Sequence, residues 1–171
     1  MKQQIYWNLL THSDWKLYIA ATEEGLCFVG SLNQTFNELK EWAEKRFPNV
    51  VLIENNDVLQ SYSDEIIEFL EGERQQFSMP MDFKGTQFQL EVWNALNNIQ
   101  YGETKTYKDI ADMINNPKAV RAVGSAIGKN PLLIMVPCHR VIGKNGTLTG
   151  YRGGLAMKKM LLKMEQLYKS V

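Results

Sequence analysis

The feature of the sequence best suited to chemistry is a cysteine set between a proline and a histidine. In the run Ile134–Gly143, Pro137 precedes Cys138, and His139 and Arg140 follow it. A thiolate is a strong, soft nucleophile, and a nearby histidine can draw off the thiol proton. A glycine-rich loop comes next, as in segments that hold the backbone close to a ligand. These neighbours favour a nucleophilic role for Cys138 over a buried structural one.

The other cysteine and histidine point to no second site. Cys27 lies in the apolar run Leu26–Val29, where a cysteine is most often a buried structural residue. With only His12 and His139 and no C-x-x-C spacing, we expect no bound metal. Two cysteines are too few for a disulfide framework and the first residues lack a signal-peptide pattern, which predicts a reduced, cytoplasmic protein. No run of about 18 apolar residues occurs, so we expect no membrane partner.

The charges are divided unequally along the chain, although the formal net charge is zero. Residues 1–85 carry 7 Lys and Arg against 14 Asp and Glu, whereas residues 86–171 carry 12 against 5. A basic half attracts phosphates through counterion release, while an acidic half stays in solvent. The net charge therefore does not exclude a nucleic-acid partner for the second half.

The first half predicts a small sheet with flanking helices. Stretches rich in aromatic and β-branched residues predict strands at Ile5–Leu10, Trp15–Ala21 and Leu26–Ser31. Apolar spacing predicts helices at Phe36–Phe47 and Asp57–Leu70. Between them, the brief apolar stretch Val50–Ile53 predicts a short extended segment. Phe77–Phe83, interrupted by Pro80, is expected to be an extended linker into the second half.

From Gly85 onward, signals for helix starts dominate. Thr86 with Gln89, and Thr106 with Asp109, match capping boxes, the second of which opens a helix to Ile114. Together the two halves predict an α+β fold: a small, mainly antiparallel sheet with helices, then a helical domain.

Two more helices are predicted further along. Asn116 is a natural N-cap with Pro117 at the first helical position, so a small-sided helix is expected over Pro117–Gly128. With the helix before it, this forms a helix-turn-helix pattern, although a plain structural corner fits the pattern equally well. The last helix is expected over Leu155–Tyr168. Its inward side is predicted to carry Met157, Met160, Leu161, Met164 and Tyr168.

Several strings with matched spacing resemble the O6-methylguanine-DNA methyltransferase family. They are PCHRV at 137–141 with a following G-x-x-G, GYRGG at 150–154, NPKAVRAVG at 116–124, YGET at 101–104 and GKNP at 128–131. The resemblance covers roughly residues 85–166. It implies a ribonuclease H-like α/β domain over 1–80, a linker at 81–85, and a DNA-binding, methyl-acceptor domain with a helix-turn-helix over 86–171.

The resemblance implies direct-reversal DNA repair without a cofactor, in which Cys138 takes the alkyl group of O6-alkylguanine once and irreversibly. O4-alkylthymine is a further candidate substrate. His139 would accept the thiol proton through a water, oriented by Glu165, and Tyr107 would be the hydroxyl donor to the flipped base. Asn130 would tie the recognition helix to the active-site loop. From the residues alone, Glu165 also fits a solvated helix charge and Tyr107 an aromatic core residue.

The resemblance also implies how double-stranded DNA is bound, by a protein we expect to be a monomer. Arg121 would enter the base stack in place of the extruded guanine, although a surface phosphate contact is an alternative. Further DNA-facing residues, some of them candidate phosphate contacts, are Lys108, Asn116, Lys118, Ser125, Lys129 and Lys144. The base pocket would be formed by Val141, Tyr151, Arg152 and Gly153. Arg152 stands where the family varies in side-chain size, so it is expected to narrow or charge the pocket mouth.

Three other functions fit parts of the pattern less well. An alkyltransferase-like damage sensor lacks the nucleophile, and Cys138 argues against it. A helix-turn-helix regulator leaves the thiol site unexplained. A cysteine hydrolase acting on peptides gives no reason for the basic, small-sided helix.

Overall fold

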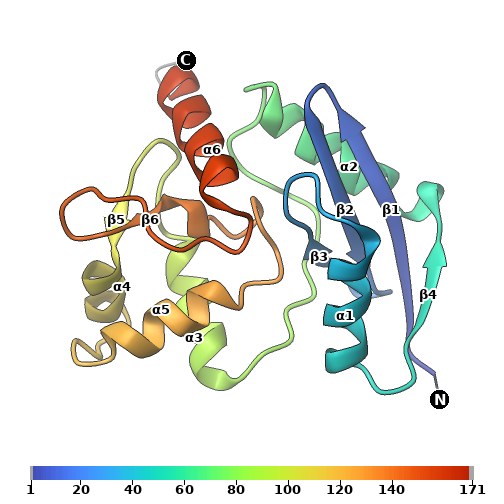
Figure 1. The fold of residues 1–171 in the computed structure, drawn as a ribbon, viewed down its shortest axis with the longest axis horizontal. Coiled ribbons are helices and arrows are strands. Elements are labelled where there is room, and N and C mark those ends of the chain that lie inside the picture. Colours follow the sequence, from blue (N-terminus) through green and yellow to red (C-terminus); the bar gives the residue numbers. More distant parts are fainter. Residues whose placement is uncertain (1, 170–171) are drawn as a thin grey trace. The chain divides into compact units, whose positions relative to one another are not determined.

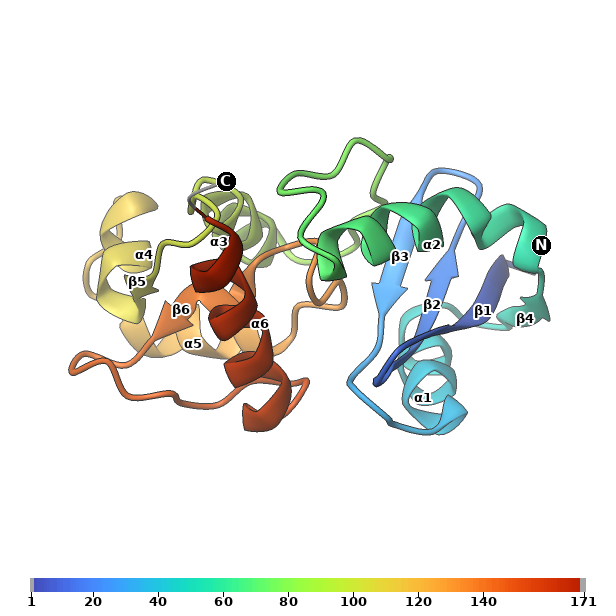
Figure 2. The same ribbon diagram turned by 90° about the horizontal axis from the view of Figure 1, so that it is seen from above.

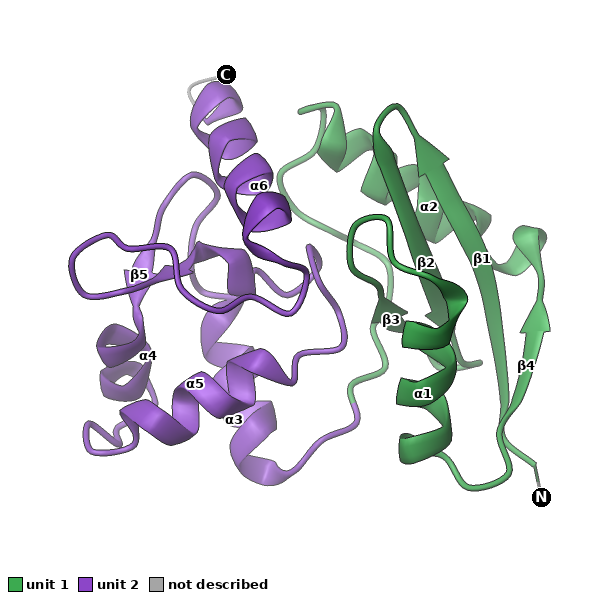
Figure 3. Cartoon of the chain, viewed as in Figure 1, with its two compact units in different colours: residues 1–83 green, residues 84–171 purple. Residues whose placement is uncertain are grey.

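The structure, a computed structural model, describes residues 2–169 (Figure 1). The chain divides into two compact units, residues 1–83 and 84–171 (Figure 3). The first unit holds the sheet and the second is mainly helical, which confirms the predicted α+β class.

The first unit is built on a four-stranded sheet in the order β3-β2-β1-β4. Its strands are β1 (Gln4–His12), β2 (Trp15–Ala21), β3 (Leu26–Val29) and β4 (Val51–Glu54). The β1–β2 and β2–β3 pairs are antiparallel, and β1–β4 is parallel. Two helices, α1 (Phe36–Arg46) and α2 (Asn56–Leu70), lie on opposite faces of this sheet (Figure 2). The sheet is therefore mixed, with the predicted antiparallel pairs in the majority.

Apolar residues of β1, β2 and β3 pack against α1 to form a core. Ile5, Phe28 and Leu39 in this core are almost completely buried. Cys27 is also buried here, with its Sγ 3.5 Å from the carbonyl oxygen of Ala20, which agrees with its expected structural role.

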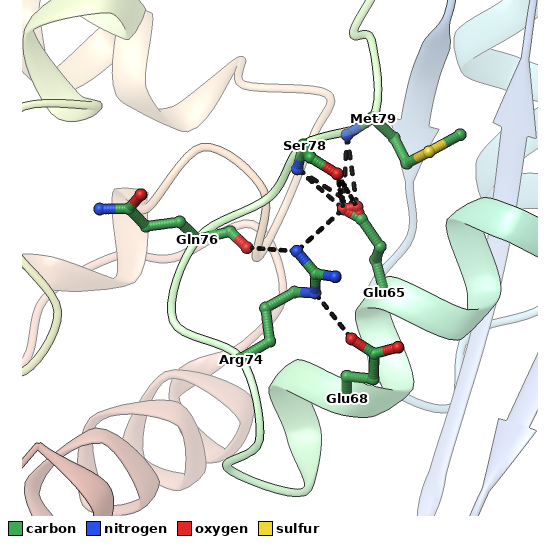
Figure 4. Close-up of polar contacts among 6 residues, drawn as sticks. All are labelled: Glu65, Glu68, Arg74, Gln76, Ser78 and Met79. Atoms are coloured by element: carbon green, nitrogen blue, oxygen red, sulfur yellow. Dashed lines mark hydrogen bonds and ion pairs between the residues drawn. The ribbon is translucent and has the colours of Figure 1, made fainter. Parts of the chain in front are cut away.

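The segment that follows α2 is held against this helix by a buried carboxylate, that of Glu65. Glu65, 5% exposed, accepts hydrogen bonds from the Ser78 amide (2.8 Å), the Ser78 hydroxyl (3.0 Å) and the Met79 amide (3.3 Å) (Figure 4). The Arg74 guanidinium lies 3.3 Å from the same carboxylate. Beyond Met79, the chain pairs with β3, because the Leu26 amide donates to the Pro80 carbonyl. The expected extended segment is thus fixed along much of its length.

The second unit consists of short helices joined by tight turns. Its elements are α3 (Gln87–Leu96), β5 (Lys105–Thr106), α4 (Tyr107–Met113), α5 (Val120–Gly128), the 3-10 turn η1 (Cys138–Arg140), β6 (Val141–Ile142) and α6 (Leu155–Tyr168). Both predicted capping boxes are present, at Thr86 with Gln89 and at Thr106 with Asp109. The parallel β5–β6 pair was not predicted, because two-residue strands carry no periodicity.

Two details of the helices differ from the prediction. The fifth helix begins at Val120 with Ala119 as its N-cap, not at Pro117 with Asn116 as its N-cap. Asn116 instead accepts a hydrogen bond from the Ala119 amide (3.0 Å), so Pro117 lies in a turn that precedes the helix. On α6, Met160 is 37% exposed and does not face inward, whereas Met157 and Leu161 are buried as predicted.

The described residues contain no helix that is both long and apolar enough to cross a bilayer.

Candidate active site

The thiol of Cys138 lies in an enclosed turn between α5 and β6. Its side chain is 2% exposed, and it opens η1. The preceding chain is folded on itself: the Val136 amide donates to the Leu132 carbonyl (3.0 Å) and the Cys138 amide to the Val136 carbonyl (2.7 Å). Ile134 in this turn has a φ of 71°, which is rare for a β-branched residue. The turn that leads to Cys138 thus contains a residue in the left-handed backbone conformation.

Asn130 connects the end of α5 to this turn. Its amide nitrogen lies within hydrogen-bond distance of the Leu132 carbonyl (3.3 Å), the Val136 carbonyl (3.2 Å) and the Cys138 Sγ (3.2 Å). Its amide oxygen accepts from the Leu132 amide (3.0 Å), and the side chain is completely buried. The side chain thus braces the turn that carries Cys138 and contacts the sulfur directly, whereas its tie to the recognition helix stays a prediction.

His139 and Glu165 form a buried pair. The His139 Nε2 lies 2.6 Å from the Glu165 Oε2, and both side chains are at most 1% exposed. An ionised carboxylate only accepts, so Nε2 carries the proton in the neutral imidazole and Nδ1 is the acceptor. Within residues 2–169, this buried Nδ1 has no hydrogen-bond partner. It is therefore positioned to receive a proton.

Arg140 and Gly102 complete the surroundings of Glu165, and neither was a predicted site residue. The Arg140 Nε and Nη2 donate to the two carboxylate oxygens (2.8 and 3.0 Å), and the Gly102 amide donates to Oε1 (3.1 Å). Arg140 also donates to the Ile99 carbonyl (2.6 Å) and lies over the Tyr101 ring at 5.6 Å. The only signal in the sequence was the place of Arg140 beside the thiol.

Burial and these partners set the charges of the site. Burial opposes ionisation of Glu165, but the hydrogen bonds from His139 and Arg140 and their electrostatic attraction prevail and lower its pKa to about 2. Burial lowers the pKa of His139 against the influence of Glu165. Burial also raises the pKa of the Cys138 thiol, which the Asn130 hydrogen bond partly offsets. At neutral pH the site thus holds a thiol, a neutral imidazole and an ionised carboxylate.

Tyr107, at the start of α4, is fixed by a residue that sequence reasoning missed. The Thr149 hydroxyl donates to the Tyr107 hydroxyl (3.1 Å). Lys158, only 1% exposed, donates to the Thr149 carbonyl (3.0 Å) and to the Val141 carbonyl (2.5 Å). Burial lowers the pKa of Lys158, although the nearby Cys138 opposes this. A lysine on an amphipathic helix normally suggests a solvated residue, so no sequence signal indicated this one.

The segment predicted as the base pocket adjoins the thiol turn. Val141 is buried, whereas Tyr151, Arg152 and Gly153 are half-buried. The guanidinium of Arg152 donates to the carbonyls of Asn130 (3.0 Å) and Pro131 (3.2 Å). Its charge is thus engaged by the loop after α5. A Cβ on Gly153 would lie 2.6 Å from both the Tyr151 ring and the Met157 sulfur, so a larger residue there would require these side chains to move.

The residues expected to contact DNA all lie on the surface of the second unit. Arg121 and Ser125 are exposed and one turn apart on α5, which packs against α4 as the second helix of the corner (Figure 1). The other exposed candidates are Lys108, Asn116, Lys118, Lys129 and Lys144. Lys108 forms an ion pair with Asp112 (2.9 Å). The structure thus places Asn130, His139 and Glu165 in one buried network beside Cys138, and leaves the DNA-binding candidates at the surface.

Comparisons with known proteins find similarity to one family over nearly the whole chain. Residues 5–83 match the ribonuclease-like domain of 6-O-methylguanine DNA methyltransferase, and residues 87–167 match its DNA binding domain. The inducible methylated-DNA–protein-cysteine methyltransferase of Bacillus subtilis is 60% identical over 165 residues, covering 96% of this chain and 92% of that protein.

Solved structures show the same likeness. The O6-methylguanine methyltransferase of Mycobacterium tuberculosis superimposes with a TM-score of 0.83 at 36% identity, covering 96% of this chain and 94% of that one. The M. tuberculosis OGT in complex with DNA gives a TM-score of 0.80 at 37% identity, with the same coverage.

Proposed function

Since the chain belongs to the O6-methylguanine-DNA methyltransferase family, and is a methylated-DNA–protein-cysteine methyltransferase that repairs DNA by direct reversal, we propose that Cys138 is its methyl acceptor. The observation that carries this proposal is the Cys138 thiol, 2% exposed and 3.2 Å from the Asn130 amide, next to the buried His139–Glu165 pair. The other cysteine, Cys27, lies in the core of the sheet unit.

We assign the removal of the thiol proton to His139. Because adjacent side chains rarely point at each other, the proton passes through a water to Nδ1, the nitrogen that faces away from Glu165. The imidazolium that results is stabilised by Glu165, which is ionised at neutral pH because its pKa is about 2. The Asn130 amide donates to the sulfur and stabilises the thiolate while it exists.

The transfer step is an in-line displacement at the methyl carbon. The thiolate of Cys138 forms the S–C bond, the C–O6 bond breaks, and its electron pair stays on guanine. The guanine anion then takes a proton, which we assign to the Tyr107 hydroxyl. The thioether has no easy route back to a thiol, so each chain acts once. These steps need no metal or organic cofactor.

We assign DNA binding to residues 86–171, the basic half, and the supporting role to the ribonuclease H-like domain at 1–80, with 81–85 as the linker. The target base is buried in the duplex stack, so it must be flipped out to reach Cys138. Arg121, exposed on α5, takes the place of the extruded guanine, and the small residues of α5 fit the narrow minor groove. The exposed lysines around α4, α5 and the 143–150 loop contact phosphates.

We further propose O6-alkylguanine as the lesion, with O4-alkylthymine as a secondary substrate. The protein acts as a monomer in the cytoplasm, where a reducing environment keeps the acceptor a free thiol, as both cysteines are in the structure.

Mass spectrometry after incubation with a duplex oligonucleotide that contains O6-methylguanine tests this proposal. We expect a gain of about 14 Da on the Cys138 peptide alone, since S–H becomes S–CH3. Cys138→Ala should abolish transfer and keep DNA binding, whereas the matched control Cys27→Ala should transfer one methyl. More than one methyl removed per chain, or a methyl on another residue, would refute the assignment.

A further inference from the structure

Thr149 lies between the proposed proton donor and a buried lysine. Its hydroxyl donates to the Tyr107 hydroxyl (3.1 Å), and its carbonyl accepts from Lys158 (3.0 Å). Lys158 is 1% exposed, and its ammonium also donates to the carbonyl of Val141 (2.5 Å), the residue directly after η1. One ammonium therefore links the chain next to Cys138 with the loop that holds Tyr107.

We propose that Thr149, held in place by Lys158, is a positioning residue for the Tyr107 hydroxyl during proton delivery to the leaving guanine. This inference rests on the proposed function, in which Tyr107 supplies that proton.

The hydrogen-bond inventory of a phenol explains why such a partner matters. A tyrosine hydroxyl has one proton to donate and lone pairs that accept. Because Thr149 donates to the oxygen of Tyr107, the phenol proton stays free to point at the base. When Tyr107 gives its proton to the guanine anion, negative charge develops on the phenol oxygen. A hydrogen bond to a charged acceptor is stronger than one to a neutral acceptor, so Thr149 stabilises the state in which the proton has moved.

Lys158 gives Thr149 its fixed place. Thr149 lies in the middle of the long loop between β6 and α6, and loops are mobile unless they are held. The ammonium of Lys158, on the second turn of α6, holds the backbone of this loop at the residue that contacts Tyr107. Lys158 thus acts on the reaction through Thr149 and through Val141, and touches no substrate itself.

The test is a double-mutant cycle on the single-turnover rate of methyl transfer from an O6-methylguanine duplex. Thr149→Val keeps the shape of the side chain and removes the hydroxyl, so we expect transfer to slow about 3- to 10-fold, the range for one lost hydrogen bond. Thr149→Ser should restore most of the rate. Tyr107→Phe should slow transfer by about 100-fold or more, as for a positioned general acid. In the Tyr107→Phe background, Thr149→Val should add no further loss.

Alkylation of Cys138 by iodoacetamide separates positioning of Tyr107 from a general effect on the loop. Iodide leaves without a proton, so Thr149→Val should not change this rate, whereas Lys158→Met should lower both rates because it also releases Val141. For Thr149→Val, a loss in iodoacetamide labelling that matches its loss in methyl transfer would overturn the inference. The inference would also be overturned if Thr149→Val slowed methyl transfer equally in the wild-type and in the Tyr107→Phe background. A wild-type transfer rate for Tyr107→Phe would overturn the assignment of Tyr107 and this inference together. Thermal unfolding of each variant verifies that it is folded.

Discussion

Replacing Glu165 with glutamine should destabilise the protein strongly at neutral pH and much less in acid. The fall of the Glu165 pKa from 4.5 to about 2 corresponds to about 3 kcal/mol of favourable interaction of the ionised carboxylate in the folded state. Glu165→Gln keeps the size of the side chain but leaves the guanidinium of Arg140 buried without a carboxylate. Removing one partner of a buried ion pair typically costs about 3–5 kcal/mol, which agrees with that figure.

The pH dependence follows from the sign of the shift. The pKa of Glu165 is lower in the folded state, so its contribution is complete above the unfolded value near 4.5 and is lost as the pH falls towards 2. The assay is urea unfolding followed by tryptophan fluorescence, with Glu103→Gln as an exposed control. We expect Glu165→Gln to lower the free energy of unfolding by about 3 kcal/mol at pH 7 and by about half of that or less at pH 3. A loss below about 1 kcal/mol at pH 7, or an equal loss at both pH values, would refute this reasoning.

Three further perturbations address DNA binding and the sheet unit. Arg121→Ala should slow repair of duplex DNA about 10- to 100-fold more than reaction with free O6-alkylguanine base, because a free base needs no unstacking; equal losses on both substrates would place Arg121 elsewhere in the mechanism. Lys144→Ala should reduce the slope of log affinity against log salt by about 0.9 in a DNA titration at several salt concentrations, while Glu41→Lys in the acidic half should leave it unchanged. A similar change of slope for both would show that the binding face is misassigned. Glu65→Gln should lower the free energy of unfolding by about 2 kcal/mol, since a buried charged acceptor of several hydrogen bonds is lost; a loss no larger than that of the exposed control Glu41→Gln would contradict this.

Much of the fold could be predicted because its signals are local. The capping pairs at Thr86 and Thr106 predicted two helices correctly, and the aromatic and β-branched residues located β1 and β2. The start of α5 could not be located in this way, since an Asn-Pro pair suits both an N-cap and a turn. Which of the two forms depends on the Ala119 amide bonding back to Asn116, a contact that the residue types do not dictate.

In the site, too, residues with local signals could be predicted, whereas those brought together by helix packing could not. Cys138 and His139 were evident from their neighbours, but Glu165 lies 26 residues further along and was expected only from the family resemblance. The bonds from Arg140 to Ile99 and from Lys158 to Val141 span 41 and 17 residues. Such pairs are set by how helices pack, so a charged residue in sequence cannot be distinguished from a solvated one until its burial is known.

The strained backbone of Ile134 affects how easily the turn beside Cys138 opens. A β-branched residue in the left-handed region costs on the order of 1–3 kcal/mol, and the hydrogen bonds and packing around it must hold it there. That strain is released whenever the turn opens locally, so opening of residues 132–136 requires less free energy than their complete burial suggests. The backbone amides of this turn should therefore exchange with solvent sooner than those of the α5 core. Hydrogen exchange of these amides thus measures how easily the chain beside the acceptor sulfur opens, a free energy that the burial of the turn does not give.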